Sequence, residues 1–164
     1  MTVEEPQAAT FADLYRETVG DVFAYVATLV GDRAAAEDVV ALAYEKAYRK
    51  RGSFDARRGS PRAWLFGIAR NAALDELRRR RRTVALVAEP GEPAVDDDPD
   101  GIARRATVRT ALAALEPRDR EVIALKYHGD LSNAEVAKLL GVSESNAGTL
   151  LHRAMTKLRE ACDA

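Results

Sequence analysis

An acidic segment rich in proline and glycine divides this chain and limits what it can fold into. Residues 83–101 read TVALVAEPGEPAVDDDPDG, with three prolines, two glycines, six carboxylates and no basic residue. The segment has no sustained apolar period, so neither a helix nor a β-strand is expected there. We therefore expect a flexible, extended linker that joins two small domains, residues 1–82 and 102–164.

The acidic run in this linker has two interpretations. It is either a simple spacer or a segment that lies in a basic groove and imitates the backbone of a nucleic acid. The flanking regions are both basic, with net charges of +3 over residues 1–82 and +2 over residues 101–164. The overall net charge of −1 therefore conceals a segregation of charge, and local patches decide which partners the chain attracts.

The first domain is expected to contain three helices. Thr10 and Asp13 have the spacing of a capping box at the start of the first helix. Asp32 is positioned to cap the second, while Ser60 followed by Pro61 predicts the start of the third. Apolar residues recur at helical spacing in the first helix: Phe11, Leu14, Tyr15, Val22, Val26 and Leu29.

The second domain is expected to contain four short helices. The first spans about residues 102–115, and the second runs from Pro117 to near Gly129. Ser132 and Glu135 form an S-x-x-E capping box for the third. No pattern of period two predicts a β-strand anywhere, so the fold class is all-α.

The third and fourth of these helices have the pattern of a helix-turn-helix, with an ordinary helical hairpin as the alternative. The small Ala137 permits close approach of the helices, and Gly141 permits a sharp turn before Ser143 caps the final helix. Apolar residues occupy the expected contact positions: Val136, Leu140, Val142, Ala147 and Leu150. The residues then expected to face DNA are Ser143, Ser145, Asn146, Thr149, His152, Arg153 and Lys157.

The third helix of the first domain combines three kinds of side chain that suit unpaired nucleic acid. It carries Trp64 near its start, Asn71 about two turns later, and the arginine run 78–82. Aromatic rings stack on bases, an amide bonds base edges, and guanidinium groups neutralise phosphates. An arginine run alone also fits a solvated helix end, and Trp64 fits a core position.

Other functional classes find little support in the sequence. No nucleophile–base pair and no phosphate-binding glycine loop is present, so an enzyme and a cofactor are not expected. Cys162 is the only cysteine, and with only His128 and His152 beside it a metal site is not expected. The acidic, polar N-terminus is not a secretory signal, and no apolar run is long enough to span a membrane, so we expect a cytoplasmic protein.

Together these features resemble the extracytoplasmic-function (ECF) group of bacterial sigma factors. AAAEDVVALAYEKAYRK is similar to the family's second-region helix, which docks on the clamp helices of the β′ subunit of RNA polymerase. FDARRGSPRAWLFGIARNAALDELRRRRR is similar to the segment that melts and holds the −10 promoter element. ALAALEPRDREVIALKYHGDLSNAEVAKLLGVSESNAGTLLHRAMTKLRE is similar to the fourth region, which reads the −35 element and docks on the β flap.

The resemblance implies roles for particular residues. The melted non-template strand would be held by Phe54, Arg57, Arg58, Ser60, Asn71, Asp75, Arg78, Arg79, Arg80, Arg81 and Arg82. The polymerase would be bound through Asp38, Val39, Val40 and Tyr44. The resemblance also implies a protein partner, since such sigma factors are commonly held inactive by a dedicated anti-sigma factor that clamps between the two domains.

Two departures from the family pattern leave alternatives open. Ala41 and Leu42 replace the usual polar Gln-acid pair, and Gly148 and Leu150 stand where basic residues are usual. The chain is then either an active sigma factor or a sigma mimic that sequesters an anti-sigma factor without productive promoter binding. The retained Asn71 and arginine run favour the first, and a dimeric helix-turn-helix regulator is a remote third possibility.

Overall fold

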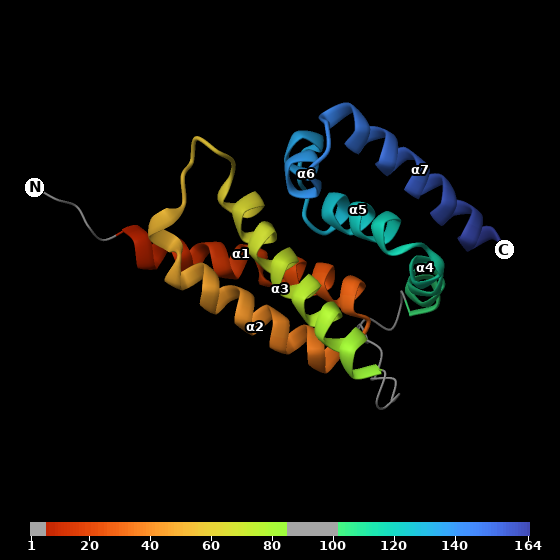
Figure 1. The fold of residues 1–164 in the computed structure, drawn as a ribbon, viewed down its shortest axis with the longest axis horizontal. Coiled ribbons are helices and arrows are strands. Elements are labelled where there is room, and N and C mark those ends of the chain that lie inside the picture. The colour runs from red at the N-terminus through yellow and green to blue at the C-terminus, as the bar shows by residue number, and fades with distance from the viewer. Residues whose placement is uncertain (1–5, 85–101) are drawn as a thin grey trace, which may run out of the picture.

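The structure is a computed structural model that describes residues 6–84 and 102–164. Within these two ranges the chain forms seven α-helices and one short 3₁₀ helix, with no β-strand, which confirms the all-α prediction. Figure 1 shows α1, α2 and α3 packed together as one domain and α4 to α7 as a second. The predicted linker, residues 83–101, lies outside the described residues from residue 85 onwards.

The N-terminal domain consists of α1 (Pro6–Val30), α2 (Arg33–Arg49), η1 (Arg51–Ser53) and α3 (Pro61–Val84). α3 therefore continues two residues beyond the domain boundary expected at residue 82. The predicted capping box at Thr10 and Asp13 is wrong, because both residues lie inside α1. Asp13 instead forms an exposed ion pair with Arg16, at 3.0 Å.

The two helix caps predicted at Asp32 and Ser60 are confirmed. α1 ends at Val30, and Gly31 follows with a positive φ of 75°. Asp32 then caps α2, accepting a hydrogen bond of 3.2 Å from the backbone N–H of Ala34. Ser60 caps α3 in the same way, accepting from the N–H of Ala63 at 3.1 Å.

The core of the N-terminal domain is built from the facing sides of its three long helices. The largest fully buried side chains there are Tyr25, Phe66, Leu65, Val22 and Val26. Tyr25 and Phe66 meet edge to face, with ring centroids 5.4 Å apart. Small alanines of α2 and α3 fill the remaining space, which brings these two helices close together.

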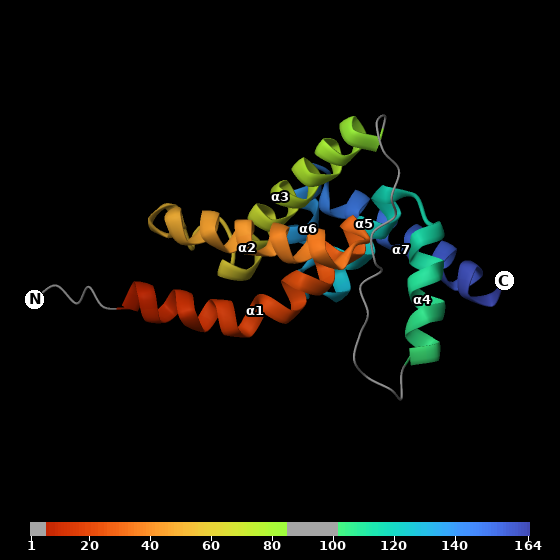
Figure 2. The ribbon, with the colours of Figure 1, turned by 90° about the horizontal axis from the view of Figure 1, so that it is seen from below.

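The C-terminal domain consists of α4 (Ile102–Ala114), α5 (Pro117–Tyr127), α6 (Asn133–Leu140) and α7 (Glu144–Asp163). The predicted capping box is complete: Ser132 accepts from the N–H of Glu135, and the Glu135 carboxylate accepts from the N–H of Ser132, both at 3.1 Å. Figure 2 shows α4 and the end of α7 at the side of the molecule far from α2.

α6 and α7 form the predicted helix-turn-helix. Gly141 ends α6 with a left-handed φ of 70°, which only glycine adopts without strain. Ala137 and Ala147 are buried where the two helices cross. Ser143 caps α7 by accepting from the N–H of Asn146 at 3.0 Å.

The two domains pack directly against each other. α5 lies against α1. α6 approaches α3, where Arg70 donates to the carbonyl of Leu139, and the buried residues of both domains form one connected core. Figure 1 shows α5 and α6 as the two C-terminal helices next to the N-terminal domain. No helix in the described ranges is both long and apolar enough to cross a membrane.

Candidate nucleic-acid and polymerase interfaces

A cavity of about 510 Å³ lies where α1, the loop after η1 and the start of α3 meet. Phe54 from the loop and Trp64 from α3 line it, and their rings meet edge to face with centroids 5.6 Å apart. Its wall carries both signs of charge: Asp13 and Glu17 from α1, and Arg51 and Arg62 near the loop. The cavity therefore offers aromatic surface, hydrogen-bond acceptors and cations to a planar polar ligand.

The predicted residues of the melted-strand site are only partly brought together. Phe54 and Ser60 line the cavity, whereas Arg57 and Arg58 are exposed on the loop beside it. Asn71 does not line the cavity. It is exposed on α3, about 10 Å along the helix from Trp64 at 1.5 Å per residue. Asp75 is exposed one turn further on, where it pairs with Arg78 at 3.2 Å.

The five consecutive arginines differ in their contacts. Arg80 is held inside the domain: it donates to Asp32 at 2.6 Å, to Glu76 at 3.2 Å and to the carbonyl of Val30 at 3.3 Å. Arg79 forms a two-pronged contact with Glu76, at 2.7 and 3.0 Å.

Arg79 holds the pKa of the Glu76 carboxyl below its ordinary value, mainly through this hydrogen bond. Arg81 and Arg82 have no ion pair or hydrogen bond to the part of the chain that the structure describes. These two are therefore the arginines of the run most available to phosphates.

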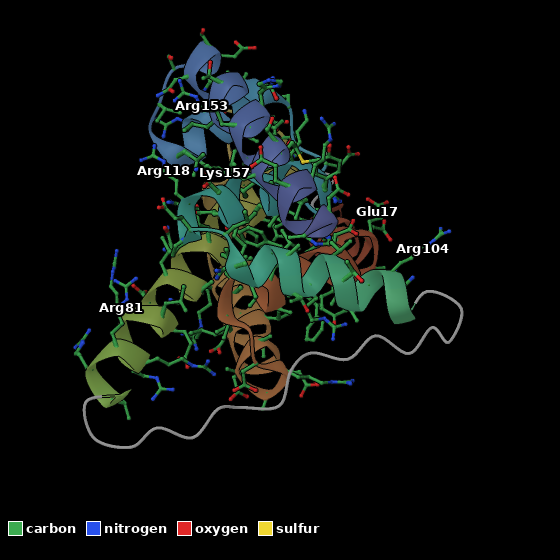
Figure 3. All side chains as sticks on the ribbon, turned by 90° about the vertical axis from the view of Figure 1, so that its right-hand side faces the viewer. Glu17, Arg81, Arg104, Arg118, Arg153 and Lys157 are labelled. Carbon is green, nitrogen blue, oxygen red and sulfur yellow. The ribbon has the colours of Figure 1, made fainter. Side chains whose placement is uncertain are left out.

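All seven residues predicted for the reading face of the helix-turn-helix are exposed. Lys157 is partly engaged, because its amino group donates to the buried carboxylate of Asp119 at 2.9 Å. This contact raises the pKa of Lys157. Figure 3 shows Arg153 and Lys157 on α7 close to Arg118 at the start of α5.

Sequence reasoning missed Arg118. It is exposed and makes no hydrogen bond or ion pair with the described residues. A signal was available, because Arg118 lies in the first turn of α5, where the helix dipole disfavours a cation. An anionic partner bound to Arg118 would offset the unfavourable interaction of its charge with the helix dipole.

Two residues of α7, Gly148 and Leu150, depart from the family pattern, and the structure accounts for one of them. Leu150 is half-buried and packs against the core, so it contributes to the helix-turn-helix contact rather than to the reading face. Gly148 has no such role: a Cβ built there would lie 3.7 Å from the Asn133 side chain, which is an ordinary contact. Nothing within the described residues requires glycine at this position.

The residues predicted to bind polymerase are mostly buried. Val39, Val40 and Tyr44 belong to the core, and only Asp38 of the four is exposed. The Tyr44 hydroxyl shares a hydrogen bond of 2.8 Å with Thr18, and burial raises the pKa of Tyr44 to about 12. Of these four side chains, α2 exposes that of Asp38, and the predicted contact with polymerase stays a prediction.

The exposed face of α2 contains the residues that depart from the family pattern. Leu42 is 43% exposed, and Ala41 beside it is also exposed. Ala41 lines a shallow apolar groove of about 400 Å³ between α1 and α2, together with Phe23 and Val19. This surface of α2 is consequently more apolar than the polar pair of the family pattern would make it.

Polar contacts join the loop and α3 of the N-terminal domain to the C-terminal domain. Arg62 donates to Asp21 at 2.7 Å and to the carbonyl of His128 at 2.9 Å, and it also bonds the carbonyl of Gly129. Arg70 forms an ion pair with Glu121, whose side chain is only 10% exposed.

Two further contacts between the domains come from α6. Ser60 donates to Glu135 at 2.6 Å, and Lys138 donates to the carbonyl of Arg58 at 2.5 Å. Burial opposes ionisation of Glu135, but the hydrogen bonds from Ser60 and Ser132 outweigh it and lower the pKa of Glu135. Arg70 also donates to the carbonyl of Leu139, at 3.2 Å. We call these contacts between the domains the interdomain interface, and its residues are Ser60, Arg62, Arg70, Glu121, Glu135, Lys138 and Leu139.

Comparison with known proteins assigns both domains. Residues 14–83 match the family model for Sigma-70 region 2, and residues 105–158 match that for Sigma-70, region 4. The ECF RNA polymerase sigma factor SigL of Mycobacterium tuberculosis (strain ATCC 25618 / H37Rv) is 34% identical over 157 residues, which are 93% of this chain and 89% of SigL. The chain belongs to the ECF sigma factor family.

Other sigma factors agree in sequence and in structure. ECF sigma factor SigM of Bacillus subtilis (strain 168) is 26% identical, over 92% of this chain and 93% of SigM. The sigma factor RpoE of Bartonella quintana, solved in complex with the anti-sigma factor NepR, matches with a TM-score of 0.83 and 25% identity, over 94% of this chain and 98% of RpoE.

CnrH in complex with the cytosolic domain of CnrY matches with a TM-score of 0.70 and 28% identity, over 95% of this chain and 89% of CnrH. Like its relatives, this ECF sigma factor acts in transcription initiation, with RNA polymerase and promoter DNA as its partners. Sigma factors as a class are transcription factors without enzymatic activity.

Proposed function

We propose that this ECF sigma factor opens promoters by holding the unpaired non-template DNA strand on the N-terminal domain. A base leaves the stack and enters the cavity beside Phe54 and Trp64, while Asn71 contacts a neighbouring base. Arg81 and Arg82 neutralise phosphates further along the strand. The observation that carries this proposal is that α3 lines the aromatic cavity at its start and, at its other end, carries two guanidinium groups that have no partner among the described residues.

We propose that the C-terminal domain reads the upstream −35 element through α7. Arg153 is the residue on the reading face best suited to a two-pronged contact with a guanine. Arg118 and Lys157 beside it suit the phosphate backbone (Figure 3). With only these two cations assigned to phosphates, the salt dependence of DNA binding by this domain should be shallow, at about −0.9 in the slope of log affinity against log salt for each contact.

Polymerase docks on the exposed face of α2, through Asp38 and the apolar surface of Ala41 and Leu42. The exposed apolar area of Leu42 gives this face a hydrophobic contribution that a polar pair would lack. Polymerase carries out the chemistry, and we propose that the chain itself is not an enzyme. It works in the cytoplasm, where polymerase and promoters are.

The solved relatives suggest a protein inhibitor. RpoE of Bartonella quintana was solved in complex with the anti-sigma factor NepR, and CnrH was solved in complex with the cytosolic domain of CnrY. We propose that an anti-sigma factor of the same kind binds this chain. The sigma-mimic alternative gains nothing from the comparisons, and a mimic has no use for the exposed Arg81 and Arg82.

A run-off transcription assay with core RNA polymerase tests the proposed function. The expected result is a promoter-dependent transcript that is lost when both Arg81 and Arg82 are replaced by alanine. Arg16→Ala is the matched control, because Arg16 lies on α1 and its ion pair, with Asp13, is exposed. No transcript from any genomic promoter that the holoenzyme selects would refute the proposal.

A further inference from the structure

We propose that the aromatic cavity selects a base that carries an exocyclic amino group, such as cytosine, and that the Glu17 carboxylate of α1 reads this group. The inference deepens the proposed function and rests on it, because it concerns the base of the non-template strand that enters the cavity. What it adds is the chemical class of that base and the side chain that distinguishes it from thymine.

The hydrogen-bond donors in the cavity wall already bind other groups of the chain. Arg62 donates to Asp21 at 2.7 Å and to two backbone carbonyls before α6. Arg51 donates to the carbonyl of Tyr48 at 2.6 Å, and its guanidinium lies 3.9 Å from the centroid of the Tyr48 ring. The hydroxyl of Ser60 donates to a carboxylate of α6 at 2.6 Å. These side chains are therefore less available as donors to a ligand.

The Glu17 carboxylate is the charged group of the wall that still needs a partner. Asp13, the other carboxylate that lines the cavity, pairs with Arg16 at 3.0 Å. Glu17 is exposed on α1 and forms no ion pair or hydrogen bond with residues 6–84 or 102–164 (Figure 3). A carboxylate accepts hydrogen bonds and does not donate them. The cavity therefore favours a ligand that brings its own donor.

The bases differ in the donors that they offer to such a group. Cytosine and adenine each carry an amino group on the edge that pairs in a duplex, and guanine carries one on its minor-groove edge. Thymine carries carbonyl oxygens and only a ring N–H, and a carbonyl oxygen placed against Glu17 would be repelled. An amino group instead donates a charge-assisted hydrogen bond, which is stronger than one between neutral groups. A base with an amino group is therefore favoured.

The origin of the side chains determines how the base can lie in the cavity. Phe54 comes from the loop and Trp64 from α3, whereas Glu17 comes from α1. Stacking on an aromatic ring uses the flat face of a base and is tolerant of its identity. A base that stacks on Phe54 or Trp64 keeps its polar edge free, and this edge can meet α1. The rings then supply affinity, and Glu17 supplies discrimination.

The charges around the cavity determine which part of a nucleotide enters it. Arg57 and Arg58 lie on the loop beside the cavity, with strongly exposed side chains. Asp13 and Glu17 line the cavity itself. Phosphates are attracted to the loop and repelled by the two carboxylates, so the base rather than the backbone lies against Glu17.

Binding of the holoenzyme to a promoter with a pre-melted, non-complementary segment tests the inference. Pairs of such DNAs differ at a single position of the non-template strand, where one has deoxycytidine and the other has deoxyuridine, and this position is moved through the segment. At one position we expect the wild type to bind the deoxycytidine DNA more tightly, on the order of tenfold, as the loss of a hydrogen bond to a charged group implies.

The Glu17→Ala variant should abolish this preference. Removal of a negative charge raises the affinity for every DNA, so the readout is the ratio of the two affinities, which a merely structural role of Glu17 would not change. Glu17→Gln is a second variant of nearly unchanged shape, and it should reduce the ratio because an uncharged amide both accepts and donates. Glu160→Ala removes the same charge from the exposed surface of α7 and should keep the wild-type ratio.

The other outcomes contradict the inference in distinguishable ways. If the wild type prefers deoxycytidine at no position but still binds the pre-melted promoter more tightly than the duplex, the inference is overturned and the proposed function stands. If the preference persists in both Glu17 variants, another group reads the base, and the inference is again overturned. If pre-melting gives no gain in affinity at all, the proposed function fails as well.

Discussion

Arg80 and Asp32 form an ion pair of 2.6 Å that ties the C-terminal half of α3 to the turn between α1 and α2. The same guanidinium contacts Glu76 and the carbonyl of Val30, the last residue of α1. Arg80 therefore has a structural role within a run of arginines that otherwise faces solvent. The neighbouring Arg81 and Arg82 make no such contacts within the described residues.

We predict that Arg80→Ala lowers the free energy of unfolding by about 1–3 kcal/mol, as expected when a partly buried carboxylate loses its charged hydrogen-bond partner. Urea unfolding followed by circular dichroism measures the change. Arg81→Ala is the control and should stay within about 0.5 kcal/mol of the wild type, as surface substitutions usually do. Equal effects of the two substitutions would show that the Arg80–Asp32 pair contributes nothing to stability.

Arg81 and Arg82 should instead determine the salt dependence of DNA binding. If each contacts one phosphate of a single strand, replacing both by alanine reduces the slope of log affinity against log salt by about 1.4, at about 0.7 per contact. The measurement is a salt titration of the holoenzyme on a promoter with a pre-melted, non-complementary segment. An unchanged slope would mean that neither residue contacts a phosphate.

The two glycines of the helix-turn-helix should respond to alanine in opposite directions. Gly141 has a φ of 70°, so Gly141→Ala forces a left-handed conformation and costs about 1–2 kcal/mol of stability. A methyl group at position 148 has room, so Gly148→Ala should stabilise α7 by up to about 1 kcal/mol. Thermal unfolding of both variants checks this pair, and a destabilised Gly148→Ala variant would contradict it.

Acidification should destabilise the chain through His128. Burial lowers the pKa of His128 below 6.5, while Asp21 nearby partly opposes the shift. The unfolded chain then binds the proton more readily, so the stabilising effect of the neutral imidazole is complete above the unfolded pKa and is lost as pH falls through the folded pKa. Urea unfolding at pH 7.5 and pH 5.5 should show this loss, and His128→Asn should remove that part of it.

Leu42 should contribute to polymerase binding through its exposed apolar area. Leu42→Ala removes part of this area and should weaken binding of a β′ fragment with the clamp helices by about fivefold, or about 1 kcal/mol at 25 cal/mol per Å². Val108→Ala is the control, since Val108 on α4 has a similar exposure of 42%. Titration calorimetry measures both, and identical affinities would exclude the apolar face of α2 as the docking surface.

Local signals in the sequence predicted the fold well wherever one short motif decides a helix end. Ser132 with Glu135, Ser60 before Pro61, and Gly141 all have their predicted roles, because each acts on backbone groups within a few residues. The capping box predicted at Thr10 and Asp13 was wrong because no short motif decides where α1 begins. The same residue types occur inside helices, and the pattern alone does not exclude an earlier start such as Pro6.

The candidate site could be predicted only in part, because long-range packing decides which face of a helix remains exposed. Val39 and Val40 of α2 are core residues, whereas Ala41 and Leu42 reach the surface. The Ser60–Glu135 hydrogen bond joins residues 75 positions apart, and no periodicity of either segment encodes it. The sequence therefore did not predict the interdomain interface.

Permanganate footprinting of a cognate promoter tests most directly whether this ECF sigma factor opens DNA on its N-terminal domain. Permanganate oxidises thymines that have left the base stack. With core polymerase and the wild-type chain, thymines around the start site should become reactive, and Arg81→Ala with Arg82→Ala should suppress this reactivity. Thymines that stay unreactive with the wild-type holoenzyme, or reactivity that the double substitution leaves unchanged, would contradict the account.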